Sequence, residues 1–244
     1  MIGRVAAIAG AVFMDAVRRR VVYAIAFFGA VLAFGIPSLP SYGLGVVGGV
    51  YREVALALTF VAALVLALAL AANRVPSEIE RRTVYGVLAR PVRRIEYLAG
   101  TWAGIAAVLA TAIGVFTVIE QVVGLLRYHD AMWRLWEGAL AIWFEVGIVA
   151  AFAVAVSALA GPVVVTVASL TMVFVGHSRD AIVGTGASVA RSLYPSLDTF
   201  NVIAPVAHGS GVALTSMLGM TLAFVGWVGV LLLLGGAGFS RRDL

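Results

Sequence analysis

The sequence predicts an all-α protein that crosses a lipid bilayer six times. Hydrophobic residues fill 62% of its 244 positions and charged residues only 12%, whereas a soluble domain carries roughly 25% charged residues. Five long stretches contain no Asp, Glu, Lys or Arg, and a helix that spans the hydrocarbon core needs about 20 apolar residues. These stretches are 21–51, 54–73, 97–119, 146–176 and 209–240. We interpret residues 1–244 as a single transmembrane domain.

The N-terminal segment, 2–20, is predicted to form an amphipathic helix in the membrane interface. Its uncharged run from Val5 to Met14 is too short to span a bilayer, and Arg18, Arg19 and Arg20 close it. A signal peptide would carry its positive charges before the apolar part rather than after it. We therefore expect this helix to lie on the cytoplasmic surface of the bilayer.

The six spans follow from the uncharged stretches and from the residues that interrupt them. Pro37 and Pro40 end the first span, and Trp133 and Trp136 precede the fourth, as aromatic residues do at membrane boundaries. Gly161–Pro162 divides an apolar run that is too long for one crossing, because proline cannot sit unkinked inside a helix. A tight hairpin should therefore join the fourth and fifth spans. The expected spans are 21–39, 53–73, 97–122, 139–160, 162–177 and 211–238.

The distribution of arginine predicts that both termini are cytoplasmic. An even number of spans places the two termini on one side. If that side is cytoplasmic, the inner residues are Arg4, Arg18, Arg19, Arg20, Arg74, Arg81, Arg82, Arg90, Arg93, Arg94, Arg241 and Arg242. The outer residues are then Arg52, Arg127, Arg134, Arg179 and Arg191. This excess on the cytoplasmic side obeys the positive-inside rule, and the inverted topology violates it.

A charged segment, "SEIERRTVYGVLARPVRR" at 77–94, separates the second and third spans. Ser77 and Glu80 have the spacing of a capping box, which begins a helix. Pro91 should end that helix at about Arg90, because a residue before proline avoids the α region. Its apolar stripe consists of Ile79, Thr83, Val84, Val87 and Leu88. We expect a short amphipathic cytoplasmic helix over 77–90; the alternative is a solvated loop that only sets the topology.

The longer sequence "EIERRTVYGVLARPVRRIEYLAG" combines a Glu-x-Glu helix, a threonine, a Leu-x-x-Pro-x-x-Arg turn and a Glu-Tyr-Leu-x-Gly start to the next span. In these features the chain resembles the permease subunits of type-2 ABC exporters. It is most similar to the branch named for multicopper-enzyme maturation, which includes the nitrous-oxide-reductase maturation permease. The N-terminal helix, "YPSLDTFN" at 194–201 and the terminal "FSRRDL" add to the resemblance. Thr101 departs from it, since the family commonly has lysine there.

The resemblance implies a transmembrane permease subunit, of exporter type, in the cell membrane. It implies that 77–90 is a coupling helix, which inserts into a groove on a separate ATP-binding subunit. The implied contacts to that subunit are Glu78, Glu80, Arg81, Arg82, Thr83, Leu88 and Arg90. The family's assembly contains two permeases and two ATPases, so a homodimer of this chain is expected. ATP and Mg would bind to the partner subunit, and this chain would not itself be an enzyme.

Composition excludes several other functions. The chain has no lysine, and the phosphate-binding loop G-x-x-x-x-G-K-[ST] requires one. It also has no cysteine, which excludes disulfides and thiol catalysis. His129, His177 and His208 are isolated in or beside predicted outer loops, so we assign neither a metal site nor a catalytic residue. The net charge of +5 is explained by cytoplasmic loops rather than by nucleic-acid binding.

Two carboxylates are candidates for a substrate path. Glu145 should lie about six residues inside the fourth span, or roughly 9 Å below its outer end. Glu120 lies near the outer end of the third span, and Arg127 or Arg134 are possible counter-charges. Such buried acids usually face a bundle interior or a watery cavity. The alternative is a structural role, in an interhelical salt bridge or as a neutral Glu145.

Two further questions stay open at the level of sequence. The third span carries small residues at 99, 100, 103, 104, 106, 107 and 110, which allow close helix approach either within the chain or across a dimer. The alternative to a permease is a non-transporting membrane anchor or scaffold subunit of a maturation complex. Copurification of an ATPase that requires residues 77–90 distinguishes the two functions.

Overall fold

The chain is a bundle of helices. The computed structural model describes residues 2–18, 21–38, 47–80, 93–178 and 194–241, and every regular element in these ranges is helical. Five segments are long and apolar enough to cross a membrane. They are α2 (Val21–Ala30) with η1 (Val31–Gly35) and η2 (Ile36–Ser38), α3 (Val47–Glu80), α5 (Arg94–Val123) with η3 (Gly124–Tyr128), α6 (Leu135–Ser157) and α11 (Leu214–Ser240). These elements make the chain a multi-pass membrane protein, as its composition predicts.

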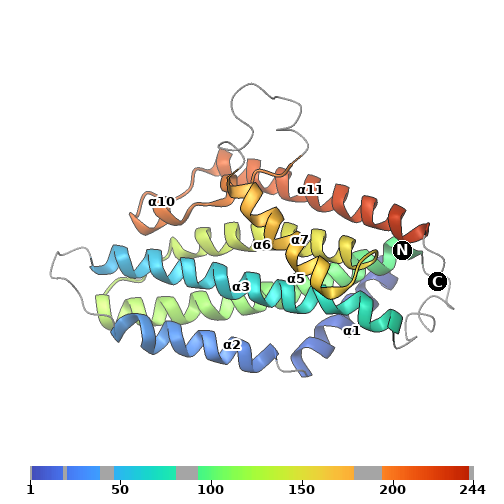
Figure 1. The fold of residues 1–244 in the computed structure, drawn as a ribbon. Coiled ribbons are helices and arrows are strands. Elements are labelled where there is room, and N and C mark those ends of the chain that lie inside the picture. Colours follow the sequence, from blue (N-terminus) through green and yellow to red (C-terminus); the bar gives the residue numbers. More distant parts are fainter. Residues whose placement is uncertain (1, 19–20, 39–46, 81–92, 179–193, 242–244) are drawn as a thin grey trace.

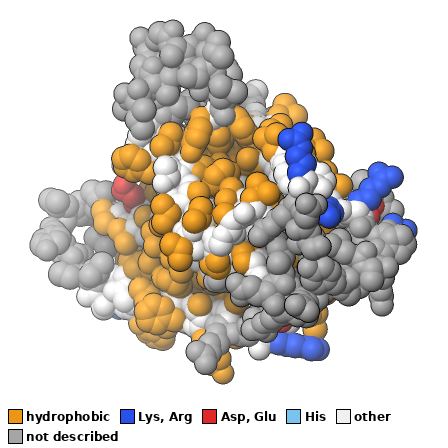
Figure 2. All heavy atoms as spheres, turned by 45° about the vertical axis from the view of Figure 1, so that its right-hand side comes forward, with side chains coloured by type: hydrophobic (Ala, Val, Ile, Leu, Met, Phe, Trp, Pro, Cys, Tyr) orange, Lys and Arg blue, Asp and Glu red, His pale blue; other side chains and the backbone are white. Residues whose placement is uncertain are grey.

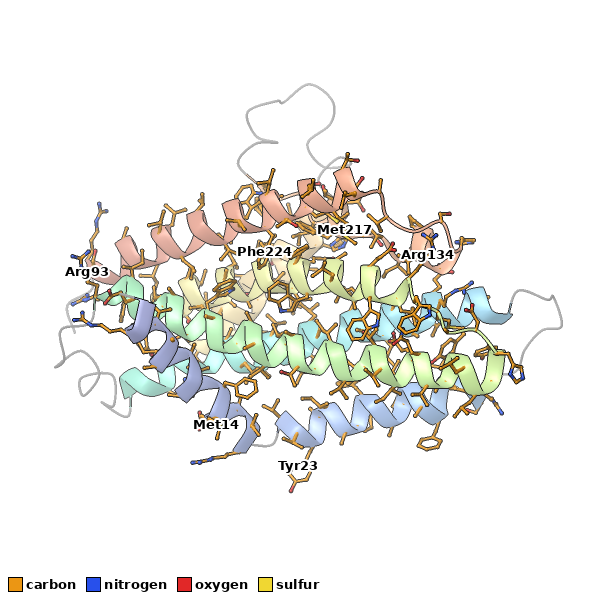
Figure 3. The ribbon with its side chains drawn as sticks, turned by 180° about the vertical axis from the view of Figure 1, so that it is seen from behind. Met14, Tyr23, Arg93, Arg134, Met217 and Phe224 are labelled. Atoms are coloured by element: carbon orange, nitrogen blue, oxygen red, sulfur yellow. The ribbon has the colours of Figure 1, made fainter. Side chains whose placement is uncertain are left out.

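The long helices lie side by side along one axis, and both chain ends lie at the same end of the bundle (Figure 1). We call this the terminal end and the opposite one the distal end. Arg93 and Arg134 mark the two ends (Figure 3). This arrangement agrees with the prediction that both termini lie on one side of the membrane, and the cytoplasmic assignment of that side stays a prediction.

Helix α6 forms the centre of the bundle and contacts α3, α5, α7 and α11. Its glycines let neighbouring side chains approach closely. Leu56 of α3 packs on Gly138, and the Phe224 ring of α11 packs on Gly147. A Cβ on Gly147 would lie 2.8 Å from that ring. Because the driving force for helix association in lipid is close packing, small residues belong at such contacts.

The outside of the bundle is apolar. Figure 2 shows hydrophobic side chains over the middle of one face and arginines at its edge. Exposed apolar side chains include Leu218 and Leu222 on α11 and Val167 and Phe174 on the short helix α7 (Pro162–His177). An apolar surface of this extent would be an aggregation hazard in water and is the normal surface of a protein in lipid.

Helix α7 corrects the prediction of six full spans. It has the predicted bounds, and Gly161 precedes it with Pro162 at its first turn, so the predicted hairpin after α6 is confirmed. However, its 16 residues reach only about 24 Å at 1.5 Å per residue. That is shorter than the hydrocarbon core of about 30 Å. The proline at one end and the polar sequence after His177 limit its length.

The second correction concerns the charged segment. We expected α3 to end near residue 73 and a separate helix to begin at Ser77. Instead α3 continues through Pro76 to Glu80. The Ser77 hydroxyl donates to the carbonyl of Arg74, 3.0 Å away, so it turns back into the helix and does not form the predicted cap. Residues 81–92 and the side chains of Glu78 and Glu80 lie outside the described part of the structure.

The N-terminal helix α1 (Ile2–Arg18) packs obliquely on the terminal half of α5 (Figure 3). Ile8 and Val12 lie against Gly100 and Gly104, where an added Cβ would come within 2.7 and 2.6 Å of them. Two of the small residues of the third span therefore serve packing within the chain. The helix is amphipathic as predicted, but its buried side faces protein and not lipid alone.

Candidate functional site: buried carboxyl groups in the helical bundle

Of the residues predicted to be functional, Glu120 and Glu145 are the two whose side chains the structure describes. Both are buried among apolar helices, with exposed fractions of 0% for Glu120 and 3% for Glu145. The predicted ATPase contacts Arg81, Arg82, Thr83, Leu88 and Arg90 lie outside the described residues. The candidate site is therefore built from the two carboxyl groups and their neighbours.

Glu120 is held between α5 and α3. It lies three residues before the end of α5 at Val123, near the distal end as predicted. The Thr59 hydroxyl donates to Glu120 Oε1 at 2.6 Å, and the Tyr51 hydroxyl donates to the backbone carbonyl of Glu120 at 3.4 Å. Glu120 Oε2 is buried and accepts no hydrogen bond from the described residues. The group is thus fixed by neutral hydroxyls and has one spare acceptor.

The counter-charges expected for Glu120 are wrong. The Arg127 guanidinium donates to the carbonyl of Pro37, 2.8 Å away. The Arg134 guanidinium lies against Gly211, whose φ is +70° and where a Cβ would sit 1.6 Å from Nη1. Both arginines stand at the distal end of the bundle, where water is available, whereas Glu120 points between helices. Sequence proximity could not distinguish these directions.

Glu145 lies deeper than predicted. Helix α6 begins at Leu135, so Glu145 is ten residues, or about 15 Å at 1.5 Å per residue, from its distal end. It therefore sits near the middle of a 23-residue helix and not close to its end. The error arose because the first turn of α6 begins before the uninterrupted apolar sequence does.

The partner of Glu145 is His177, at the end of α7. The distance from Glu145 Oε1 to His177 Nε2 is 3.3 Å, but the angles are not those of a hydrogen bond, so Oε1 has no hydrogen-bond partner among the described residues. Asp198 in the short turn η4 (Asp198–Phe200) acts electrostatically on Glu145. The Phe60 ring of α3 meets the imidazole edge-on at 6.0 Å.

The sequence did not point to His177, because its partner is 32 positions away. A search for partners three or four residues apart finds neighbours on one helix only. The usable signal was the hairpin at Gly161–Pro162, since antiparallel neighbours bring residues on either side of a tight turn together. Counting residues away from the turn along both helices places His177 of α7 beside the half of α6 that contains Glu145.

Paired tryptophans fix α5 against α6 on the other side of Glu145. The Trp102 indole donates to the carbonyl of Gly147 at 3.0 Å, and the Trp143 indole donates to the carbonyl of Ala106 at 2.9 Å. Phe224 of α11 packs on the Trp143 ring at 5.2 Å (Figure 3). Each indole thus reaches the carbonyl one turn beyond the other tryptophan. The two indole hydrogen bonds therefore attach this face of α6 to α5, and the opposite face carries the polar side chain of Glu145.

The distal end is closed by two polar attachments. Arg52 of α3 donates to the carbonyl of Ala207 at 2.9 Å and pairs with Asp130 at 2.9 Å. Glu137 of α6 accepts from the backbone N–H of Val212 at 2.6 Å. These bonds tie the chain around α10 (Ile203–Ala207) to α3 and α6.

Each of the two carboxyl groups has one buried oxygen that accepts no hydrogen bond from the described residues. No group of three or more His, Cys, Asp or Glu in the described part of the chain could hold a metal ion. The chain matches no protein-family model and no curated protein. The residues and their geometry are therefore the basis for a proposed function.

Proposed function

We propose that the chain is the transmembrane permease subunit of an ABC exporter and works with a separate ATP-binding subunit in the cell membrane. The observation that carries the proposal is the charged sequence 77–94 between two long apolar helices, with the sequence features that resemble type-2 permeases. A chain without lysine has no phosphate-binding loop of its own, so the ATP and Mg belong to the partner.

The geometry around this segment supports a coupling role. Helix α3 ends at Glu80 and α5 begins at Arg94, so the segment joins the two helices at the terminal end of the bundle (Figure 1). Helix α1 is attached to both of them, through the Asp15–Arg74 ion pair to α3 and through Arg4 and Glu96, 3.8 Å apart, to α5. A displacement of the segment would therefore move α1, α3 and α5 together.

Under the same proposal, Glu145 and Glu120 are the two candidates for the substrate path. Both offer a buried oxygen without a donor, and intramembrane acids often mark such a path. Two copies of the chain with two ATPases would form the transporter.

The test is a charge reversal in the segment. We expect R81E with R82E to insert normally into the membrane but to lose the copurifying ATPase and the ATP-driven transport. The matched control is R18E with R241E, which makes the same change of charge on two exposed arginines elsewhere. If the R81E/R82E protein keeps its ATPase and full transport, the coupling role is wrong. If the wild-type chain copurifies with no ATPase, the scaffold function replaces the permease.

A further inference from the structure

The end of α7 lies beside the middle of α6, inside the bundle. From Ser157, where α6 ends, Glu145 is 12 residues back, or about 18 Å at 1.5 Å per residue. The 16 residues of α7 therefore reach the level of Glu145 and stop part-way along the bundle (Figure 1). There the backbone N–H of Leu197 donates to the carbonyl of Gly176 at 3.3 Å. Irregular backbone at membrane depth occurs where protein or a polar site covers it.

The hydrogen bonds of His177 determine where one of its protons lies. The distance from His177 Nδ1 to the carbonyl oxygen of Val173 is 3.1 Å. A carbonyl oxygen only accepts, so Nδ1 carries the hydrogen. In a neutral imidazole with a hydrogen on Nδ1, the other nitrogen, Nε2, is an acceptor.

Nε2 is the atom that faces Glu145 Oε1 at 3.3 Å. An ionised carboxylate is also an acceptor only. A neutral His177 and an ionised Glu145 would thus place two lone pairs against each other, at a Glu145 oxygen that is buried and accepts no hydrogen bond from the described residues. A buried polar atom without a hydrogen-bond partner is destabilising. One additional proton, on Nε2 or on Oε1, removes the conflict, and a small rotation of either side chain then aligns the bond.

The surroundings favour a positive ligand. His177 is in the last turn of α7, where the helix dipole presents its negative end. Asp198 of η4 is the charged side chain that acts on Glu145. From α3 the neighbour is the Phe60 ring, and Glu120 of α5 is hydrogen-bonded to Thr59 instead. Among the described residues no arginine forms an ion pair with Glu145.

The site also limits the size of that ligand. Glu145 is buried, and the described residues hold no cluster of three metal-ligating side chains. We propose that Glu145 and His177 together bind one proton at the end of α7 and that this shared proton holds α7 against α6. The inference does not depend on the ATPase partner, because it follows from the two side chains alone.

The experiment counts the protons on the pair at pH 7 in lipid nanodiscs. Nitrogen-15 NMR of histidine-labelled protein shows whether the His177 ring carries one hydrogen or two, with H177Q for assignment. Infrared spectroscopy of carbon-13-glutamate protein shows whether Glu145 is a carboxylic acid, from the band that E145Q removes and E120Q retains. We expect one of the two signatures: a doubly protonated ring or a protonated Glu145.

His208 is the internal control. Its Nδ1 lies 2.8 Å from the carbonyl of Ala204, also four residues back, but it is exposed and no described carboxylate pairs with it. Its signals should be the same in wild type and E145Q, whereas the shared proton at His177 should be lost. A His177 ring with a single hydrogen beside an ionised Glu145 in the wild-type protein would overturn the proposal. The decisive measurement is made on the wild-type protein, and the variants serve only to assign its signals.

Discussion

Glu120 and Glu145 are the same residue type in the same kind of surroundings, yet they are held differently. Glu120 lies between two continuous helices, and its Oε1 accepts from the Thr59 hydroxyl at 2.6 Å. Glu145 lies beside the end of a helix, and the atom nearest its Oε1 is an imidazole nitrogen at 3.3 Å. Each has one buried oxygen that accepts no hydrogen bond from the part of the chain that the structure describes.

This difference shows that the side chain next to a buried carboxyl group determines what the carboxyl group can do. A hydroxyl keeps its proton, so Thr59 can only fix Glu120 in place. An imidazole nitrogen can either donate or accept a hydrogen bond, so His177 can meet Glu145 in two ways. Glu145 is therefore the better candidate for function and Glu120 for structure.

The largest effect is expected for H177L. Removing His177 leaves the buried Glu145 carboxyl group without its partner, and the loss of one partner of a buried charged pair costs about 3–5 kcal/mol. Thermal unfolding in detergent should show this loss, and the double variant E145L/H177L should recover most of it. H208L, at an exposed histidine with the same bond to its own helix, should change stability by less than about 0.5 kcal/mol. Equal losses of stability in H177L and H208L would contradict a stabilising role for the Glu145–His177 pair.

The next effect is expected on transport. E145Q keeps the shape of the side chain but removes the ionisable group, and we expect transport to fall at least about tenfold, which is about 1.4 kcal/mol. E120Q should leave it within about twofold, because its amide oxygen still accepts from Thr59. Transport and melting temperature are measured together on purified complexes. A fall in stability with normal turnover per folded E145Q complex would make Glu145 a structural residue.

The last prediction tests the structural role of the hydrogen bond between Thr59 and Glu120. T59V removes the hydroxyl that donates to Glu120 and should cost about 1–2 kcal/mol of stability, with transport per folded complex unchanged. T111V is the control, since the exposed Thr111 hydroxyl donates only to Ala107 of its own helix. Chemical unfolding of both variants measures the difference. A transport defect in T59V at wild-type stability would give Glu120 a function.

The sequence was informative wherever one property is repeated along a helix. Long uncharged runs located all five long helices and the short α7, and Gly161–Pro162 located the hairpin, because hydrophobicity and proline act locally. The sixth full span failed for a physical reason, since 16 residues do not reach across the hydrocarbon core. The prediction that a new helix starts at Ser77 was wrong, because α3 continues through Pro76 to Glu80.

The candidate site was predicted only in part. Burial of Glu120 and Glu145 follows from a charge in an apolar helix, but their partners do not. Thr59 and His177 reach these carboxyl groups from other helices, and the rotation of each helix about its axis decides which side chains meet. Arg127 and Arg134 were reasonable counter-charges by depth, yet they point to backbone groups at the distal end.

Measuring the composition of the native assembly tests the proposed permease function most directly. The chain should be tagged at its C-terminus, extracted from its own membrane in a mild detergent and analysed by native mass spectrometry. A permease subunit should appear as two copies of this chain with two copies of an ATP-binding subunit. A single copy per assembly, or a complex without any ATP-binding subunit, would contradict the proposed function.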